Sequence, residues 1–318
     1  MEEVAPLVSI VIVCMNRPDN LYPCLEGVRA HTSVPCETFV VAYRFTPENL
    51  ARAQADFPWV KWIESREIRG FAENNNLALR RARGRWCFIL NDDTELHEDV
   101  IGALVRDFGQ LPPDAAIVCP RLLNADGSLQ LCGRPPYPAR YYVLQQWHLH
   151  REPIDDTVGK TPLFGEVFRT SNISGAAALI RTDIFRELGW LDETYFFTPE
   201  DIALSTLARK RGYGVYVDRA VCLVHKWRTT ATRISPAVRP AAVRGSLLFF
   251  SGGSRVRYFL LALPVWLAEC SKRAKAALRL RRDPSEENRI AWETFRNISR
   301  SIFTRRCPKE IFIRYFNG

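Results

Sequence analysis

Short apolar runs alternate with stretches of helical periodicity from residue 7 to about residue 230. Runs such as "VSIVIVC" and "WCFIL" are almost continuous in large apolar residues, which is typical of strands buried on both faces of a parallel sheet. The pattern predicts strands at residues 7–16, 37–44, 59–65 and 85–90. Between them, helical spacing predicts helices around residues 21–28, from Thr46-Pro47 onward, and at 71–82. This alternation predicts a doubly wound α/β layer, with a mostly parallel central sheet and helices on both faces.

The pattern continues beyond residue 98 with one interruption. It predicts helices at 98–108 and 196–212, strands at 116–120 and 213–225, and a strand running into a helix at 174–185. Asp126-Gly127 is typical of a hairpin turn. Residues 133–172 show no clear periodicity, and a stretch of that length is more often a functional loop or insertion than part of a scaffold.

Helix ends are also predicted from local signals. Thr182 or Asp183 is expected to cap the helix within 174–185. Thr198 is expected as the N-cap of the later helix, with Pro199 at its first position and Gly212 ending it.

Polar residues follow several of the predicted strands. Asn16, Arg44 and the "NDD" segment at 91–93 all come directly after a strand. Ligands of doubly wound sheets bind beyond the carboxyl ends of the strands, so we expect these residues to share one crevice.

Two acidic pairs are candidates for chemistry. Asp92-Asp93 suit Mg²⁺ or Mn²⁺, although Asp also favours turns after strands. Glu200-Asp201 fall in the first turn of a helix, where interaction with the helix dipole is an alternative explanation. With His225 at a strand end, they suggest metal-assisted group transfer, in which one pair holds cation and diphosphate and the other removes a proton. A backbone-bonded histidine is equally consistent with His225.

Four segments in order resemble the family 2 glycosyltransferases, especially rhamnosyltransferase-like members. They are "VSIVIVCMNRP", "RGFAENNNLALRRARGRWCFILNDDTEL", "SGAAALIRTDIFRELGWLDETYFFTPED" and the final His of "VYVDRAVCLVH", and the match covers about residues 6–230. The resemblance implies a GT-A fold. It also implies inverting transfer of a hexosyl or rhamnosyl group from a nucleotide-diphosphate sugar, such as a dTDP- or UDP-sugar, with Mn²⁺ or Mg²⁺ as cofactor.

The resemblance also implies roles for individual residues. Asp201 would be the catalytic base, with Glu200 holding acceptor or base in place, and Asp93 and His225 would bind the metal. The donor and its nucleotide would be contacted by Asn16, Arg17, Arg69, Gly70, Asn74, Asn75, Asp92 and Arg209. Arg69 and Arg209 could equally be solvated surface charges.

The chain departs from the family pattern at two places. After the second strand the family usually has an acid that helps to read the base, whereas here "VVAYRFTPEN" has none before Glu48. A frequent second acid of the "ED" helix is Ala203 in this chain. The first departure leaves base recognition to another contact, or indicates a relative with impaired catalysis.

Composition fits a folded protein with one large domain and an appendage, at 318 residues, 47% hydrophobic and 25% charged. The nine cysteines are odd in number and form no C-x-x-C pair, which predicts reduced thiols in a cytosolic compartment. Residues 7–13 lack the basic flank of a secretory signal, which favours the same location.

The positive charge is concentrated at the end of the chain. Residues 235–318 contain 17 Lys or Arg and 6 Asp or Glu, which leaves 27 basic and 29 acidic side chains for the preceding residues. We therefore expect a glycosyltransferase domain at 1–232 and a basic, mostly helical region at 233–318.

Residues 257–282 hold an apolar run of about ten residues before six basic ones, too short to span a bilayer, which takes ~20. The run could lie at an anionic membrane surface, with Phe259 and Trp266 among the headgroups. A core helix followed by a solvated basic helix is the alternative. Nucleic acid is not expected as a partner, because aromatics do not alternate with the charges.

Together these features predict a metal-dependent, inverting glycosyltransferase. Its expected acceptor is a glycan or lipid-linked hydroxyl in polysaccharide or cell-envelope synthesis, and its expected place is the cytoplasm, at the inner face of the plasma membrane. A catalytically impaired nucleotide- or glycan-binding relative and a membrane-associated scaffold acting through the basic tail are the alternatives.

Overall fold

The computed structural model describes residues 5–155, 157–226 and 234–317. Within these residues nine strands form one sheet, in the order β3-β2-β1-β4-β8-β6-β9-β5, with β7 beside β9. The strands are β1 (Val8–Cys14), β2 (Cys36–Tyr43), β3 (Lys61–Ser65), β4 (Trp86–Asn91), β5 (Thr94–Glu95), β6 (Ala115–Leu123), β7 (Val167–Arg169), β8 (Ala177–Arg181) and β9 (Gly214–His225). β1 to β4 are mutually parallel where they pair, and β8 runs antiparallel between β4 and β6. The expected mostly parallel α/β sheet with helices on both faces is confirmed, and its antiparallel pairs make it a mixed sheet.

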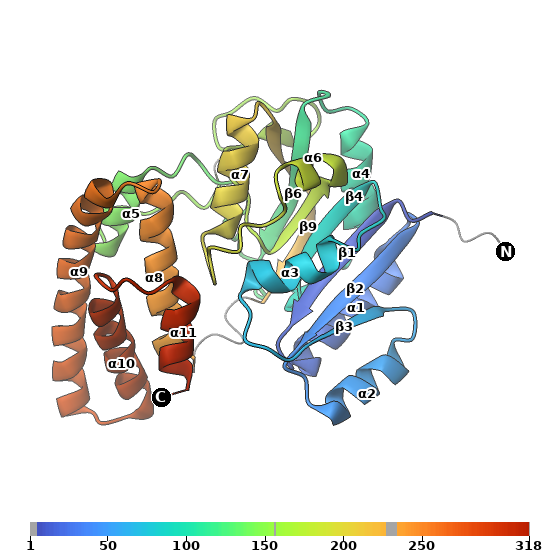
Figure 1. Ribbon diagram of the computed structural model, residues 1–318. Helices are drawn as coiled ribbons and strands as arrows, with labels where there is room; N and C mark the ends of the chain where they lie inside the picture. Colours follow the sequence, from blue (N-terminus) through green and yellow to red (C-terminus); the bar gives the residue numbers. More distant parts are fainter. Residues whose placement is uncertain (1–4, 156, 227–233, 318) are drawn as a thin grey trace.

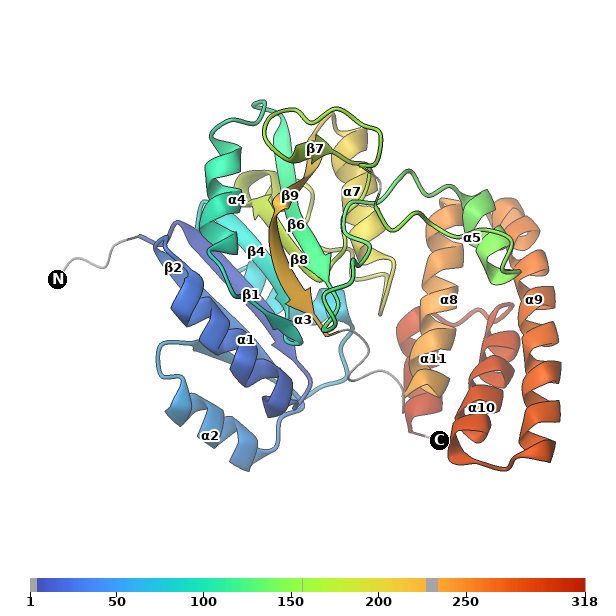
Figure 2. The same cartoon turned by 180° about the vertical axis from the view of Figure 1, so that it is seen from behind.

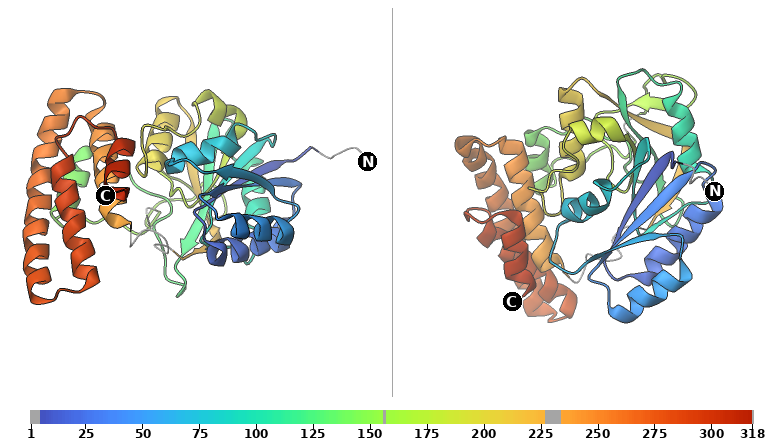
Figure 3. Two further views of the ribbon diagram at one scale, coloured as in Figure 1. Left: turned by 60° about the horizontal axis from the view of Figure 1, so that its bottom comes forward. Right: turned by 45° about the vertical axis from the view of Figure 1, so that its right-hand side comes forward.

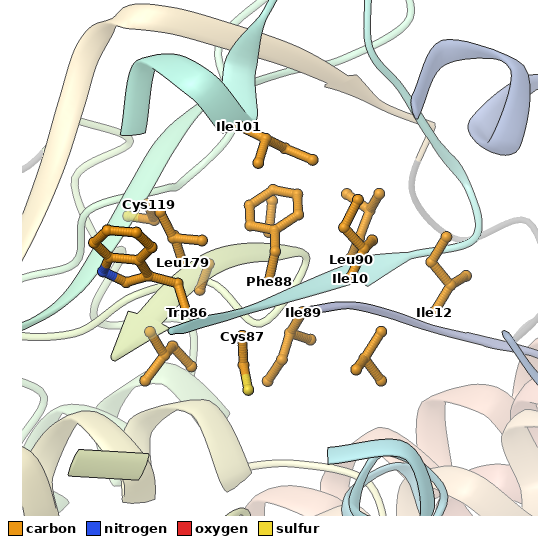
Figure 4. Packing of buried hydrophobic residues seen from close by; sticks show 14 of the residues in the cluster. Ile10, Ile12, Trp86, Cys87, Phe88, Ile89, Leu90, Ile101, Cys119 and Leu179 are labelled. Atoms are coloured by element: carbon orange, nitrogen blue, oxygen red, sulfur yellow. The ribbon is translucent and has the colours of Figure 1, made fainter. Parts of the chain in front are cut away.

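Helices cover both faces of the sheet (Figures 1 and 2). One face carries α3 (Phe71–Leu79), α6 (Thr182–Glu187) and α7 (Glu200–Lys210), and the other carries α1 (Pro18–His31), α2 (Pro47–Asp56) and α4 (Val100–Phe108). β4 shows why such strands are apolar throughout. Trp86, Phe88 and Leu90 point to one side of it and Cys87 and Ile89 to the other, and all five are buried (Figure 4).

Several local predictions are confirmed and two caps are wrong. The Thr46 hydroxyl accepts the Asn49 N–H at the start of α2, as expected. Thr182 and Asp183 are instead the first two residues of α6, and the N-cap position belongs to Arg181; the Thr182 hydroxyl donates to the carbonyl of Gly84 at 2.8 Å. α7 begins at Glu200 with Pro199 in the N-cap position, which displaces the predicted cap Thr198.

The segment at 133–172 is more ordered than its sequence suggests. It contains α5 (Ala139–Gln146) and β7. α5 packs on the C-terminal helices through Tyr142, its one buried residue, which lies in a hydrophobic cluster with residues of α8, α9 and α10. The hairpin turn at Asp126-Gly127 is confirmed by the Asn124–Ser128 backbone bond and a φ of +81° at Gly127.

The C-terminal region is helical, as expected. It consists of α8 (Ser235–Ser251), α9 (Arg255–Arg282), α10 (Glu286–Ser301) and α11 (Pro308–Phe316), which stand beside the sheet (Figure 3). A hydrophobic cluster joins α5, α8, α9 and α10, and a second joins Phe196 to α8 and α11. The expected domain boundary between residues 232 and 233 lies outside the described residues. All nine cysteines are free.

Candidate active site

One cavity of about 370 Å³ opens beyond the carboxyl ends of β1, β2 and β4. Of the polar strand ends expected to share a crevice, residues 91–93 line it, whereas Asn16 and Arg44 do not. The starts of α3 and α7 and the end of β9 complete its polar wall. Ile234, Val238 and Phe312 contribute an apolar wall from the C-terminal region. The cavity therefore lies between the sheet and the C-terminal helices.

The acidic strand end after β4 meets the end of β9. The β5–β9 ladder pairs Thr94 with His225, which brings the His225 ring against Asp93. Nε2 of His225 lies 3.2 Å from Oδ1 of Asp93, and both residues are buried. Nδ2 of Asn91 is 3.4 Å from the same Nε2.

Gln130 determines which ring nitrogen of His225 carries the proton. Its amide nitrogen donates to the carbonyl of His225 and to Oδ1 of Asn124, so its Oε1 is the atom that faces Nδ1, at 2.8 Å. Nδ1 then donates, and in the neutral imidazole the lone pair of Nε2 is directed toward Asp93. Two acceptors at that separation repel each other unless a proton or a cation lies between them. This arrangement fits a metal, because a bond to the second ring nitrogen is what orients metal-binding histidines.

The metal set is incomplete in protein ligands. No group of three or more His, Cys, Asp or Glu side chains that could hold a metal occurs among the residues described. Mg²⁺ and Mn²⁺ sites at diphosphates commonly use one or two protein carboxylates and complete their shell with phosphate and water. Asp93 and His225 therefore fit a cation that is bound together with a nucleotide.

Asp92 lies beside this pair on the cavity wall. Burial raises the pKa of its carboxyl to about 7, and the charge of Asp93 adds to the rise, whereas the Cys14 thiol and Arg17 oppose it. Burial, more than the repulsion between the adjacent carboxylates, thus favours the protonated form of Asp92. A cation bound at Asp93 would release that proton.

Asp201 stands at the start of α7, facing the same cavity. Its Oδ2 accepts the Gly175 N–H at 3.3 Å and lies 3.7 Å from Nη1 of Arg134. Arg134 also forms a two-pronged pair with Glu152, at 2.8 and 3.3 Å. The Asp201 side chain is 16% exposed, so this cation and this backbone N–H orient it within the pocket.

Glu200 differs from its neighbour although both are acids. Burial raises its pKa to about 8, and the charge of Asp201 adds to the rise. Its Oε2 accepts the Thr198 N–H at 2.6 Å, which fixes the turn before α7. The raised pKa therefore favours the protonated form of Glu200 at neutral pH.

The start of α3 forms the opposite wall. A Cβ at Gly70 would lie 2.4 Å from the carbonyl oxygen of Phe196, so only glycine fits there. The Arg69 guanidinium is held by Ser65 and Glu67 and is 25% exposed. It lines the cavity and is not the solvated surface charge that was the alternative. Asn74 is buried and bonded to Ser65.

The structure brings together most of the predicted site residues. The cavity is lined by Arg69, Gly70, Asn74, Asp92, Asp93, Glu200, Asp201 and His225. Four others do not line it, and their contacts explain why. The Asn16 side chain accepts the Thr46 N–H before α2, and the Asn75 side chain donates to the Phe71 carbonyl. Arg209 lies at the far end of α7, near Asn172. The charge of Arg17 lowers the pKa of Asp92, but Arg17 does not line the cavity. Any contact of these four with a ligand stays a prediction.

Four residues that shape the site were not predicted from the sequence: Gln130, Arg134 and Glu152, which lie between β6 and β7, and Phe312 in α11. Arg134 and Glu152 lie in the stretch that was expected to be functional only because it lacked periodicity. Nothing in the local pattern marks Phe312, because its position in the cavity wall depends on how α11 packs against Phe196.

Known proteins were compared with this chain. The model of the family "Glycosyl transferase family 2" matches residues 9–189. The O-antigen biosynthesis protein RfbC of Myxococcus xanthus is 26% identical over 74% of this chain and 18% of its own. An N-acetylglucosaminyl-diphospho-decaprenol L-rhamnosyltransferase of Mycobacterium tuberculosis is 27% identical over 52% of this chain and 54% of its own. The chain thus spans about a fifth and about half of these two relatives.

Solved structures show the same fold at low identity. GalNAc-T7, in a crystal structure with UDP, GalNAc and Mn²⁺, has a TM-score of 0.55 at 16% identity, over 76% of this chain and 51% of its own. The mannosyltransferase PcManGT of Pyrobaculum calidifontis, in complex with GDP-Man and Mn²⁺, has a TM-score of 0.53 at 16% identity, over 94% of this chain and 86% of its own. With the family match covering more than half of the chain, the protein belongs to glycosyl transferase family 2 and has the GT-A fold.

Proposed function

We propose that this protein is an inverting, metal-dependent glycosyltransferase that moves a sugar from a nucleotide-diphosphate donor to an acceptor hydroxyl. The observation that carries the proposal is the pairing of two different acidic sites across one cavity. Asp93 with His225 forms one site, and Asp201 with Arg134 forms the other. Inverting transfer needs these two functions, charge compensation at the leaving diphosphate and proton removal at the acceptor.

Asp93 and His225 would hold the cation. When bound, the metal supplies positive charge that offsets the charge gathering on the leaving diphosphate. One carboxylate oxygen and one imidazole nitrogen suit Mn²⁺ better than Mg²⁺, which prefers oxygen ligands only. Arg69 lines the same cavity and would bind the donor.

Asp201 is the proposed general base. An alcohol is too weakly acidic to ionise at neutral pH, so a carboxylate must accept its proton as the new glycosidic bond forms. The Gly175 N–H and the Arg134 guanidinium hold the Asp201 carboxylate toward the cavity. The protonated Glu200 holds the turn before α7, which places Asp201 without competing for the acceptor's proton.

The names of the similar proteins are the basis for proposing a donor and an acceptor. A rhamnosyl or other hexosyl donor and a lipid-linked or glycan acceptor match the decaprenol-diphosphate rhamnosyltransferase and the O-antigen protein. Such acceptors would place the reaction at the cytoplasmic face of a membrane, in cell-envelope polysaccharide synthesis.

The test is a thermal-shift panel of dTDP-, UDP- and GDP-sugars with and without Mn²⁺, followed by turnover with the stabilising donor and determination of the product's anomeric configuration. We expect Mn²⁺-dependent stabilisation by one donor class and an inverted product. A retained configuration would overturn the inverting mechanism. Binding without turnover with lipid-linked acceptors would favour the impaired relative, which the lack of an acid after β2 also suggests.

A further inference from the structure

The outward face of α9 carries an apolar stripe. Large apolar side chains recur along it at helical spacing, and all are at least 41% exposed: Val256, Phe259, Leu260, Leu263, Leu267 and Leu278. At about 1.5 Å per residue, the unbroken part from Val256 to Leu267 is roughly 16 Å long, and Leu278 follows on the same face beyond Ser271 and Ala274. Exposed Phe303, from the end of α10, contacts Phe259 and widens it. An exposed apolar surface of this kind usually marks an interaction site.

The opposite face of α9 already has its partners. Ala262, Val265 and Ala268 are buried against the other helices. Trp266, which was expected among lipid headgroups, is half-buried and donates to the carbonyl of Ser299 at 3.1 Å. The side chains of the stripe do not belong to the hydrophobic cluster that packs the C-terminal helices together. α9 also lies on the side of the bundle that faces away from the sheet (Figures 1 and 2).

Basic side chains border the stripe on both sides. At about 100° per residue, Arg257 and Lys275 lie on one flank and Arg255 and Arg273 on the other. α9 contains eight basic residues and one acid. That acid, Glu269, is fully buried and paired with Lys272 at 2.6 Å, so the exposed face of α9 has no negative charge.

We propose that the outer face of α9, together with Phe303, docks the protein onto an anionic lipid surface. An apolar stripe between two basic flanks is the arrangement of helices that lie in the plane of a membrane. The apolar side chains would enter the headgroup and acyl boundary, while the flanking charges meet anionic lipid. No described helix is long and apolar enough to cross a bilayer, so the contact is peripheral.

A second copy of the chain fits the stripe less well. Pairing two α9 helices through it would place basic flank against basic flank, because the helix exposes no acid to compensate. Like charges placed opposite one another in an interface oppose association. The charge pattern therefore favours anionic lipid over self-association.

The experiment is co-sedimentation of the full-length protein with phosphatidylcholine vesicles, with and without phosphatidylglycerol. We expect binding only to the anionic vesicles, weakened by salt. The double variant Leu260→Ser/Leu263→Ser should lose at least ~10-fold in vesicle affinity, since each buried apolar side chain contributes to insertion. Arg257→Gln/Lys275→Gln should lose about 5-fold for each charge removed.

Matched controls come from exposed residues elsewhere. Leu149→Ser/Val158→Ser removes side chains that are 72% and 76% exposed, and Arg52→Gln/Arg66→Gln removes exposed charges far from α9. Equal loss in these controls, equal binding to neutral vesicles, or no binding at all would overturn the proposal. If the protein did not bind vesicles but formed a dimer, and Leu260→Ser/Leu263→Ser dissociated that dimer, the apolar face would bind a second copy of the chain instead.

Vesicle binding does not depend on catalysis, so the two proposals fail separately. Asp201→Asn should bind anionic vesicles as the unsubstituted protein does. Leu260→Ser/Leu263→Ser should retain Mn²⁺-dependent stabilisation by the donor, because neither leucine lines the cavity. If both readouts fell together in the leucine variant, the stripe would be part of the fold and the docking proposal would be overturned.

Discussion

Asp201 is the residue whose replacement separates chemistry from binding most cleanly. Asp201→Asn keeps the size of the side chain and an acceptor for the Gly175 N–H but cannot take a proton. We expect turnover to fall by ~10²-fold or more while donor affinity changes little. Single-turnover kinetics and donor titration measure the two effects. Exposed Asp192→Asn is the control, and near-normal transfer by folded Asp201→Asn would shift the role of base to Glu200.

Asp93 should control the metal-dependent part of nucleotide binding. Asp93→Asn removes the charge that faces Nε2 of His225, so the cation loses a charged ligand while the buried geometry is preserved. We expect Mn²⁺ to add no stabilisation by the nucleoside diphosphate in a thermal-shift titration, with metal-free binding retained. Unchanged Mn²⁺-dependent stabilisation would mean that these acids only form the turn after β4.

Glu200 should leave a signature in the dependence of stability on pH. Its pKa is raised to about 8 by burial, so between its ordinary value near 4.5 and about 8 the unfolded chain loses a proton that the folded chain keeps. Stability contributed at this site therefore falls as pH rises through that window. Glu200→Gln should gain stability relative to the unsubstituted protein toward pH 8, on the order of a few kcal/mol. Urea denaturation at pH 5 and pH 8 measures the difference, and a pH-independent difference would contradict it.

At the scale of elements, α11 connects the tail to the cavity. Phe312 packs on Phe196 and Phe316, with ring centroids 4.4 and 4.9 Å apart, and Lys309 pairs with Glu73 of α3 at 2.7 Å. The helix is thus fastened to the start of α3, the wall that carries Arg69 and Gly70. Arg44, which follows β2, lies over the ring of Phe316, 5.2 Å from its centroid, so α11 brings an aromatic surface to the strand end where the chain lacks the acid.

Phe312→Ala should therefore weaken donor binding. A buried Phe→Ala change also costs ~3–5 kcal/mol in stability, so a matched control is needed. Phe250→Ala removes a comparably buried ring from the helical cluster that does not line the cavity. We expect both variants to lower the melting temperature but only Phe312→Ala to raise the donor Kd, measured well below melting. An equal change of Kd in both would assign Phe312 to stability alone.

At the scale of the whole molecule, the C-terminal helices form part of the cavity wall on one side and part of the outer surface on the other. Val238 and Phe312 line the cavity, while α9 faces the other way. A chain ending at residue 233 would lose that wall and expose Phe196, which is 5% exposed in the intact protein. We expect a lower melting temperature and loss of donor-dependent stabilisation, measured by calorimetry. Full donor binding by the truncated chain would make the tail a separable anchor.

The sequence by itself determined the α/β layer and the places where its strands end. A strand buried on both faces must be apolar throughout, and a helix on a sheet must repeat its apolar residues every third or fourth position, so these elements are encoded locally. Asp92, Asp93 and Asp201 were identifiable for the same reason, because each lies at the end or start of such an element. Departures were local too. Thr198 is not the cap, because α7 begins at Glu200 and Pro199 occupies the N-cap position.

Only the tertiary structure decided which residues meet across elements. Gln130 orients His225, 95 residues further along the chain, and Arg134 lies beside Asp201, 67 residues further along. No periodicity in the sequence indicates either contact. Tertiary packing likewise decided that α5 enters the C-terminal bundle, that Phe312 lines the cavity, and that one face of α9 stays open. Such contacts depend on the shape of distant surfaces, since burial of an apolar side chain stabilises any well-packed arrangement and does not specify its partner.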